Sequence, residues 1–440
     1  MKDTNNFTIY NCHTHSFNLN HVNDRFTKGM FLITLRISML RNWRFFRWII
    51  RKFENSSKPT FRRLSYFVIH SFKIETQKVK SQKEIIRDLK SYYPSGTRFV
   101  IHTMDMDFMI DGKDPENSRY NDQLRDLANI KQTIVNRDIV FPFIHADPRR
   151  INKYPFYFRR LSYYIKKGIF SGIKIYPALG YFPFDKRLKP VYDLALQYNL
   201  PITAHCSIGP VYFRGSLKYF KDHDFYKDGK LFHPYSGKEL PGKKPKYFTQ
   251  HFTHPLNYAC LFDAEFISRY WKIPVEDAKL YRKLKICLAH YGGSEEWMRY
   301  LKFPWRPDSA NPLDLKHWKH TIRESGFWYR FSNFFFPKSP DRRASWFSII
   351  SGMLKKYPNL YSDVSFSLSD GDMYPLLKLG LLKDRKLSKK ILFGTDFYMV
   401  SMAGAERELS IKLRSYLGEE LFKIIAHDNP KKFLKNKIKI

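Results

Sequence analysis

Short apolar runs recur along the chain, and each ends in polar, glycine or proline residues. Helical patterns separate several of them, for example at 188–199 and 344–359. Because buried parallel strands read as near-continuous apolar runs, this alternation predicts an α/β chain. The runs are FTIYNCHTH (7–15), TRFVIHTMDMD (97–107), DIVFPFIHADP (138–148), FSGIKIYPALG (170–180), LPITAHCS (200–207), LKICLAHYGG (284–293), NLYSDVSF (359–366) and KKILFGTDFYM (389–399).

Eight strands that alternate with helices predict a (β/α)8 TIM barrel, a fold of about 250 residues. This chain has 440 residues. The excess falls at about 17–95, 208–282 and 298–345, and each stretch follows a predicted strand. We therefore expect a single domain over 1–440 with three long loop insertions at the C-terminal face of the barrel, where active sites of this fold lie.

Charge and cysteine content bear on partners and compartment. The formal net charge of +36 would attract nucleic acid, acidic lipid or an anionic substrate. The basic residues are spread along the whole chain, which favours a solvated surface over a nucleic-acid site. The cysteines form no CxxC pair, and Cys12, Cys206 and Cys287 fall in predicted core strands. This pattern indicates buried free thiols in a reducing compartment.

The sequence predicts a cytoplasmic protein. MKDTNNFTIY lacks the apolar segment of a secretory signal, and no apolar run reaches the roughly 18 residues of a spanning helix. Residues 30–53 have the pattern of a basic amphipathic helix, with Trp43, Phe46 and Ile50 on one face. Two interpretations stay open: a lid helix over the barrel mouth, which we favour, or peripheral contact with an anionic membrane surface.

Metal-ligating side chains stand at the ends of several predicted strands. His13 and His15 are two positions apart in one strand, so both point to the same side, as two ligands of one ion require. Imidazole and carboxylate ligands suit zinc above all, and also manganese, iron or nickel. The set predicts one divalent ion at the barrel mouth, or two if Lys174 is carboxylated. In chain order the candidate ligands are His13, His15, Lys174, His205, His290 and Asp396.

These motifs resemble the amidohydrolase superfamily, and most closely its amidohydrolase-related branch, which includes aminocarboxymuconate semialdehyde decarboxylase. The resemblance covers nearly the whole chain except the three insertions. It rests on HTH (13–15), ADPRR (146–150), GIKIYP (172–177), AHC (204–206), AHYGG (289–293), LYSDVS (360–365), GTDF (394–397) and NPKKFL (429–434).

The resemblance implies that His13, His15 and Asp396 bind the first metal. In one-metal members His205 is the remaining ligand, and His290 hydrogen-bonds the metal-bound water or the substrate. In two-metal members both of these histidines bind the second ion, and a carboxylated lysine bridges the pair. KIYPA, at 174–178, looks like the bridging-lysine strand of dihydroorotases. Many one-metal relatives also carry a lysine there, so the number of ions stays open.

The expected activity is hydrolysis of an amide, lactone or ester carbonyl. A divalent ion lowers the pKa of the water it binds towards 7. Asp396 then serves as general base, and His290 or the metal polarises the carbonyl. Non-oxidative decarboxylation or hydration on the same scaffold is the first alternative, because these reactions share ligands. A membrane- or polyanion-binding protein that uses the basic insertions is the second, and the intact ligand set favours the enzyme.

Several further residues are candidates for supporting roles. The guanidinium of Arg149 suits a substrate carboxylate, although salt bridging is the stronger expectation, and Tyr176 shares a face with Lys174. Buried Lys174 needs a partner: Asp396, a substrate anion or carboxylation. We expect a small substrate, anionic or aromatic, and a homodimer as the commonest assembly. Three aspartates are expected to orient other groups or to lie in turns: Asp105, Asp107 and Asp363.

Overall fold

The computed structural model describes residues 7–21, 80–109, 119–209, 211–240, 246–302, 344–368, 371–397 and 406–438. The basic segment 30–53 lies outside these ranges, so both interpretations of it stay predictions. Most of the insertions at 17–95 and 298–345 lie outside them as well. Among the described residues, no helix combines the length and the apolar character needed to cross a membrane.

Eight parallel strands form one sheet in the order β1-β2-β3-β4-β5-β9-β10-β11. Each predicted apolar run contains one of them. Their bounds are β1 Tyr10–His15, β2 Arg98–His102, β3 Val140–His145, β4 Gly172–Ile175, β5 Pro201–Ser207, β9 Lys285–Gly292, β10 Leu360–Asp363 and β11 Ile391–Leu392.

The first and last strands meet, so the sheet closes on itself. The Cys12 amide donates to the Phe393 carbonyl at 2.8 Å, and Thr14 forms a parallel bridge with Phe397 just beyond β11. Across the same seam, the Asn11 amide donates to the Thr395 hydroxyl at 2.8 Å. The predicted parallel barrel is therefore confirmed.

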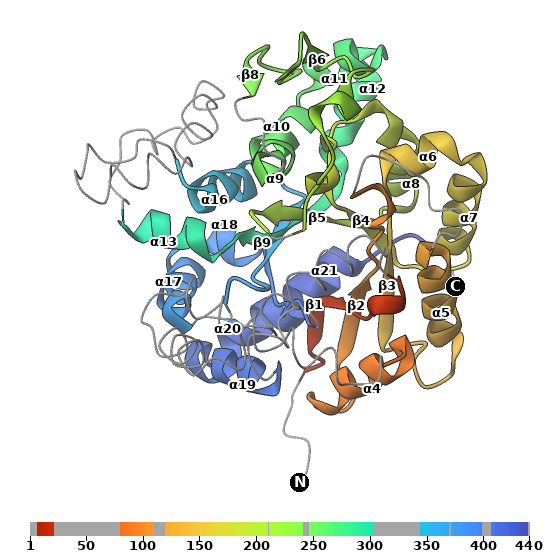
Figure 1. The fold of residues 1–440 in the computed structure, drawn as a ribbon. Helices are drawn as coiled ribbons and strands as arrows, with labels where there is room; N and C mark the ends of the chain where they lie inside the picture. The colour runs from red at the N-terminus through yellow and green to blue at the C-terminus, as the bar shows by residue number, and fades with distance from the viewer. Residues whose placement is uncertain are drawn as a thin grey trace, which may run out of the picture.

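Helices surround the barrel, with α5, α6, α7 and α8 along one side of it (Figure 1). The predicted helices at 188–199 and 344–359 are α8 and α16. Ser345 caps the start of α16 with its side chain, whereas α8 ends at Asn199 in a left-handed conformation, φ +52°. The longer helices are α4 Gln82–Ser91, α5 Arg119–Gln132, α7 Pro155–Lys166, α8 Lys189–Tyr198, α16 Trp346–Lys356, α17 Tyr374–Lys383 and α19 Glu406–Leu417; the shorter α6 is Pro148–Lys153 and α21 is Asn429–Leu434.

The barrel interior has its own apolar cluster, separate from the larger core between sheet and helices. Every strand from β1 to β3 and from β9 to β11 contributes to it, and Phe433 of α21 packs against Tyr361 with ring centroids 5.2 Å apart. The cluster comprises Tyr10, Cys12, Val100, Phe143, Cys287, Tyr361, Leu392 and Phe433. These residues define which side of each strand faces inward.

The insertion at 208–282 folds between β5 and β9. It contains a small antiparallel sheet, β6 Tyr226–Lys227, β7 Lys230–Phe232 and β8 Glu239–Leu240, and the helices α9 Lys246–Thr253, α10 Leu256–Leu261, α11 Ala264–Trp271 and α12 Val275–Lys279. These elements gather at the top of Figure 1. Helix α9 packs against β5 and against the turn Pro177–Leu179 that follows β4. This insertion therefore lies over strand C-terminal ends.

Candidate metal centre

Ionisable side chains form a layer directly above the interior cluster. In a strand, residues two apart face the same side, so the residue two positions after each inward-facing one also points into the barrel. Paired residues of neighbouring parallel strands also face the same side. Lys174 pairs with His145, and His205 lies two positions after Thr203, the partner of Lys174, so both belong to the same layer. The layer contains His102 of β2, His145 of β3, Lys174 of β4, His205 of β5 and Asp363 of β10.

An irregularity in β1 brings its two histidines into this layer. The pairing register with β2 shifts between Asn11 and Thr14. Cys12 faces the barrel interior, so strict alternation would turn its neighbour His13 outward. The register shift instead lets His13 reach Asp363 and His15 reach Asp396. Gly394 permits this close approach, because a Cβ at that position would lie 2.8 Å from the Cβ of His13.

His13, His15 and Asp396 present three ligand atoms to one another. Nε2 of His13 lies 3.6 Å from Oδ1 of Asp396, and Nε2 of His15 lies 3.2 Å from the same oxygen. Both Nδ1 atoms have other partners: Oδ2 of Asp363 at 2.9 Å for His13 and the His102 carbonyl at 3.0 Å for His15. Since a carbonyl only accepts, Nδ1 of His15 carries a proton, and in the neutral ring Nε2 then has the lone pair.

The spacing of these atoms fits a divalent ion. Two ligands bound at 2.0–2.1 Å in a tetrahedral site are about 3.4 Å apart. Burial lowers the pKa of His13 well below its ordinary value, and the nearby Lys174 ammonium lowers it further. The imidazole is therefore neutral at pH 7, as metal binding requires.

Both carboxylate oxygens of Asp363 have hydrogen-bonding partners within the protein. His13, His290 and Asp363 also bring three ligand atoms within 4.8 Å of one another. However, Oδ2 of Asp363 pairs with Nδ1 of His13, and Oδ1 accepts from the His290 amide at 3.0 Å and from the Ser365 hydroxyl. A carboxylate in this position fixes the tautomer and the orientation of a ligating imidazole.

His290 is also held in one orientation. Because the Ser365 hydroxyl donates to Asp363, it accepts from Nδ1 of His290, 3.0 Å away, and the Ser365 carbonyl lies 3.3 Å from the same atom. Nε2 of neutral His290 then carries a lone pair. It can bind a metal or accept a proton, whereas polarisation of a carbonyl would need the protonated ring. His290 and Asp396 both adopt left-handed backbone conformations, φ +66° and +63°, which concentrate at functional sites.

His205 and Tyr176 form a stacked pair beside this centre. Their ring centroids are 3.9 Å apart with an interplanar angle of 12°, so Tyr176 restricts rotation of the His205 ring. The centroid of His205 lies 4.9 Å from that of His290. The predicted ligand His205 is thus adjacent to the centre, and Tyr176 lies against a predicted ligand.

Lys174 is fully buried, and its Nζ lies 3.4 Å from Nε2 of His13. Burial lowers the pKa of Lys174 to about 8, and the charges of Asp363 and Asp396 oppose that shift. Among the described residues, Lys174 forms no ion pair within 4 Å, with Asp396 or any other carboxylate. The structure therefore leaves a substrate anion and carboxylation as the partners expected for this lysine.

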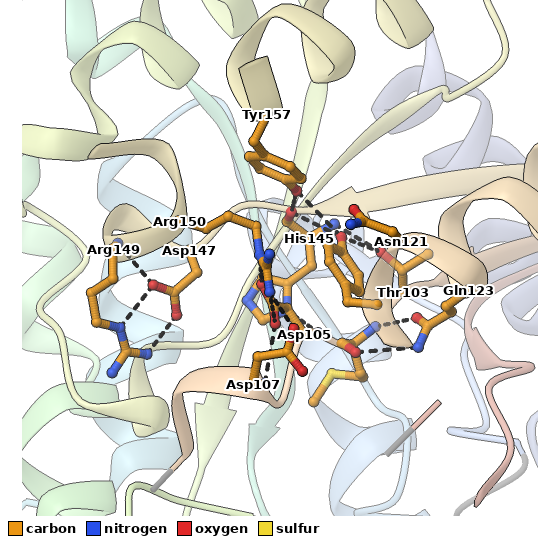
Figure 2. A network of polar contacts seen from close by, with 12 residues as sticks. Thr103, Asp105, Asp107, Asn121, Gln123, His145, Asp147, Arg149, Arg150 and Tyr157 are labelled. Atoms are coloured by element: carbon orange, nitrogen blue, oxygen red, sulfur yellow. Dashed lines mark hydrogen bonds and ion pairs between the residues drawn. The ribbon is translucent and has the colours of Figure 1, made fainter. Parts of the chain in front are cut away.

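Arg149 uses its guanidinium inside the protein. It forms a two-point contact with Asp147, at 2.8 Å from Nε and 2.5 Å from Nη2 (Figure 2). It also donates to the Leu179 carbonyl at 2.8 Å. These contacts match the salt-bridging role and bring Arg149 to none of the candidate ligands.

Two histidines of the layer, His102 and His145, were not singled out from the sequence. Each is the last residue of its strand, in FVIH and FPFIH. A histidine at the end of an apolar run could have identified them, because His205 in LPITAH was recognised by the same position. A lone strand-end histidine has many structural uses, however, and the aspartates that follow in these two runs are also common in turns.

Comparisons with known proteins reveal only distant likenesses. No family model matches the chain, and no curated protein matches it. Similar solved structures include an uncharacterised TIM-barrel protein from Bordetella bronchiseptica, with 12% identity, 97% of this chain and 98% of that chain covered, and a TM-score of 0.42. They also include 4-oxalomesaconate hydratase from Rhodopseudomonas palustris, with 12% identity, 97% and 95% coverage, and a TM-score of 0.40. A candidate amidohydrolase from Staphylococcus aureus has 13% identity, 80% and 91% coverage, and a TM-score of 0.42. The site is therefore interpreted from its own residues.

Proposed function

We propose that this chain is a metal-dependent hydrolase of the amidohydrolase superfamily. The observation that carries the proposal is the convergence of His13 Nε2 and His15 Nε2 on one Asp396 oxygen, with both Nδ1 atoms held by other groups. Closure of the sheet brings these two ends of the sequence together, but closure alone does not require three buried ligand-type side chains to converge at the seam. The motif resemblance to the amidohydrolase-related branch points to the same set.

His13, His15 and Asp396 would hold one divalent ion, which we expect to be zinc. His205 and His290 stand beside them and would complete the coordination or hold a second ion. When bound, the ion would supply Lewis acidity and an activated water. His13 enters such a site already neutral and oriented, because burial and the Asp363 contact fix its protonation and its tautomer.

The remaining chemistry falls to side chains of the chain. Asp396 directs Oδ1 towards the two imidazoles, which leaves Oδ2 to accept a proton from the attacking water and to return it to the leaving group. Nε2 of His290 can accept a hydrogen bond from the same water in the tautomer that Ser365 imposes. Polarisation of an amide, lactone or ester carbonyl would then depend on the ion rather than on this imidazole.

Metal content by mass spectrometry is the first test. Wild type purified without chelator should hold one or two equivalents, and the His13→Ala, His15→Ala variant should hold almost none. His233→Ala is the matched control, because His233 is equally buried but lies in the insertion and pairs with Asn257. Metal-free wild type that also fails to take up zinc or manganese would refute the proposal.

A substrate panel then separates hydrolysis from its alternatives on the same ligands. Amides, lactones and esters would report hydrolysis, whereas carboxylic acids would be followed by CO2 release. Product that forms from a carboxylic acid with release of CO2, and none from the carbonyl panel, would assign a decarboxylase. Either activity should disappear in the His13→Ala, His15→Ala variant and persist in His233→Ala.

A further inference from the structure

Three buried ring nitrogens on neighbouring strands have no hydrogen-bond partner in the described part of the chain. They are Nδ1 and Nε2 of His102 on β2, and Nε2 of His145 on β3. Both residues are at most 1% exposed. Buried polar groups in native proteins nearly always have partners, and an exception calls for an explanation such as a missing ligand. Both rings belong to the layer at the barrel mouth.

The tautomer of His145 follows from its one hydrogen bond. The Asp105 amide donates to Nδ1 of His145 at 2.7 Å, so Nδ1 carries the lone pair. In neutral imidazole the proton must then be on Nε2. The unpartnered atom is therefore an N–H donor, and in this tautomer it cannot bind a metal ion.

A buried ion cluster holds His145 in this state. Arg150 contacts Asp105 at 2.5 Å and also pairs with Asp107 (Figure 2). The Tyr120 hydroxyl donates to the His145 carbonyl at 3.0 Å. The carboxylates nearest to His145, those of Asp105 and Asp147, are thus already paired with Arg150 and Arg149. Neither is left to accept from Nε2.

The donors cluster on one side of the mouth. His145 and Lys174 are direct partners in the β3–β4 pairing, so their side chains point inward next to each other. The His102 ring lies one strand away, 4.4 Å from the His13 ring. The carboxylates of the layer, Asp363 and Asp396, come from β10 and just beyond β11, on the opposite arc of the barrel. A group bound on the β2–β4 side would meet these donors, and the carboxylates on that side, Asp105 and Asp147, are already paired with arginines.

We propose that His102, His145 and Lys174 form a subsite for a carboxylate group of the substrate, next to the metal ligands. Nε2–H of His145 and Nζ of Lys174 would each donate to a carboxylate oxygen, and an N–H of His102 would complete the set. The inference rests on the proposed function, because it assigns the substrate of that site to the carboxylate-bearing small molecules. It also gives buried Lys174 an anionic partner, which this lysine does not have within 4 Å among the described residues.

Nuclear magnetic resonance of protein labelled with 15N-histidine tests the subsite without a known substrate. The probe is sodium acetate, compared with sodium chloride at equal ionic strength, and the His145 signals are assigned with His145→Gln. We expect the Nε2–H tautomer, a saturable shift of His145 and His102 with acetate alone, and no shift of His233. The absence of a specific acetate shift, or an Nδ1–H tautomer, would overturn the proposal.

Two variants and one labelling experiment complete the test. His145→Phe should weaken acetate binding at least about tenfold, read from the His102 signals, whereas His145→Gln keeps a donor and should weaken it less.

The His13→Ala, His15→Ala variant should still show the acetate shift of His145, which separates failure of this subsite from failure of the metal centre. Loss of the shift there would mean that acetate binds the metal. A carbamate signal on Lys174 after addition of 13C-bicarbonate would also overturn the proposal, because the modified lysine would then occupy the donors.

Discussion

Nδ1 of His13 lies 2.9 Å from Oδ2 of Asp363, and both side chains are completely buried. The Asp363 contact fixes the orientation of His13, and its charge would make His13 a stronger ligand for the proposed ion. Asp363→Asn should therefore weaken metal affinity by about 10- to 100-fold, measured by competition with a chromogenic chelator. Asp277→Asn on the exposed face of α12 is the control. Unchanged affinity in Asp363→Asn would show that this contact is only structural.

Gly394 provides space for His13. Its substitution by alanine would place a methyl group 2.8 Å from Cβ and 3.2 Å from the backbone nitrogen of His13. We expect Gly394→Ala to lower the free energy of unfolding by about 1–3 kcal/mol and to reduce metal content. Gly371→Ala is the control, because a Cβ there meets nothing within 4 Å. Equal stability of the two variants in urea unfolding would contradict the close packing of this seam.

The Arg150 cluster should be costly to break. Arg150→Met leaves Asp105 and Asp107 buried without their cation, which should destabilise the fold by about 3–5 kcal/mol. Lys279→Met removes an exposed pair with Glu276 and should change stability by less than about 1 kcal/mol. Addition of Asp105→Asn and Asp107→Asn to Arg150→Met should recover part of the loss. No recovery would mean that packing, rather than unpaired charge, causes it.

Glu406 should make stability fall as pH rises. Burial raises its pKa to about 7, although hydrogen bonds from Thr395 and Tyr93 oppose the shift. The folded state therefore holds a proton that the unfolded state has lost above pH ~4.5, and this stabilisation disappears as pH passes 7. Between pH 5 and 8, wild type should lose about 2.5 kcal/mol relative to Glu406→Gln, measured by urea unfolding across that range. Parallel pH profiles would exclude a raised pKa.

All eight barrel strands were predictable because parallel strands are buried on both faces and appear as apolar runs. The predicted ligands His13, His15 and Asp396 meet because each ends or follows a strand, and strand C-terminal ends converge in this fold. The structure also places Lys174 beside His13, as its strand-end position suggested.

The remaining features depend on tertiary detail. The register shift in β1 has no signature in YNCHTH, and the orienting role of Asp363 depends on a partner 350 positions away. The sequence allows Arg149 to bind a substrate carboxylate. In the structure its guanidinium contacts Asp147, two positions earlier. His102 and His145 are candidates because three of their four ring nitrogens lack a hydrogen-bond partner in the described part of the chain, which the sequence does not show.

The seam of the barrel also has a temporal consequence. Asn11 and Thr395, which hydrogen-bond across it, are 384 positions apart. At about 5–20 residues per second, a ribosome needs about 20 to 80 s to make the chain between them. During that interval β1 has only one of its two neighbours, and His13 and His15 have no Asp396 to meet. Assembly of the candidate ligand set must therefore follow synthesis of almost the entire barrel, and the nascent chain must be protected from edge-to-edge association until then.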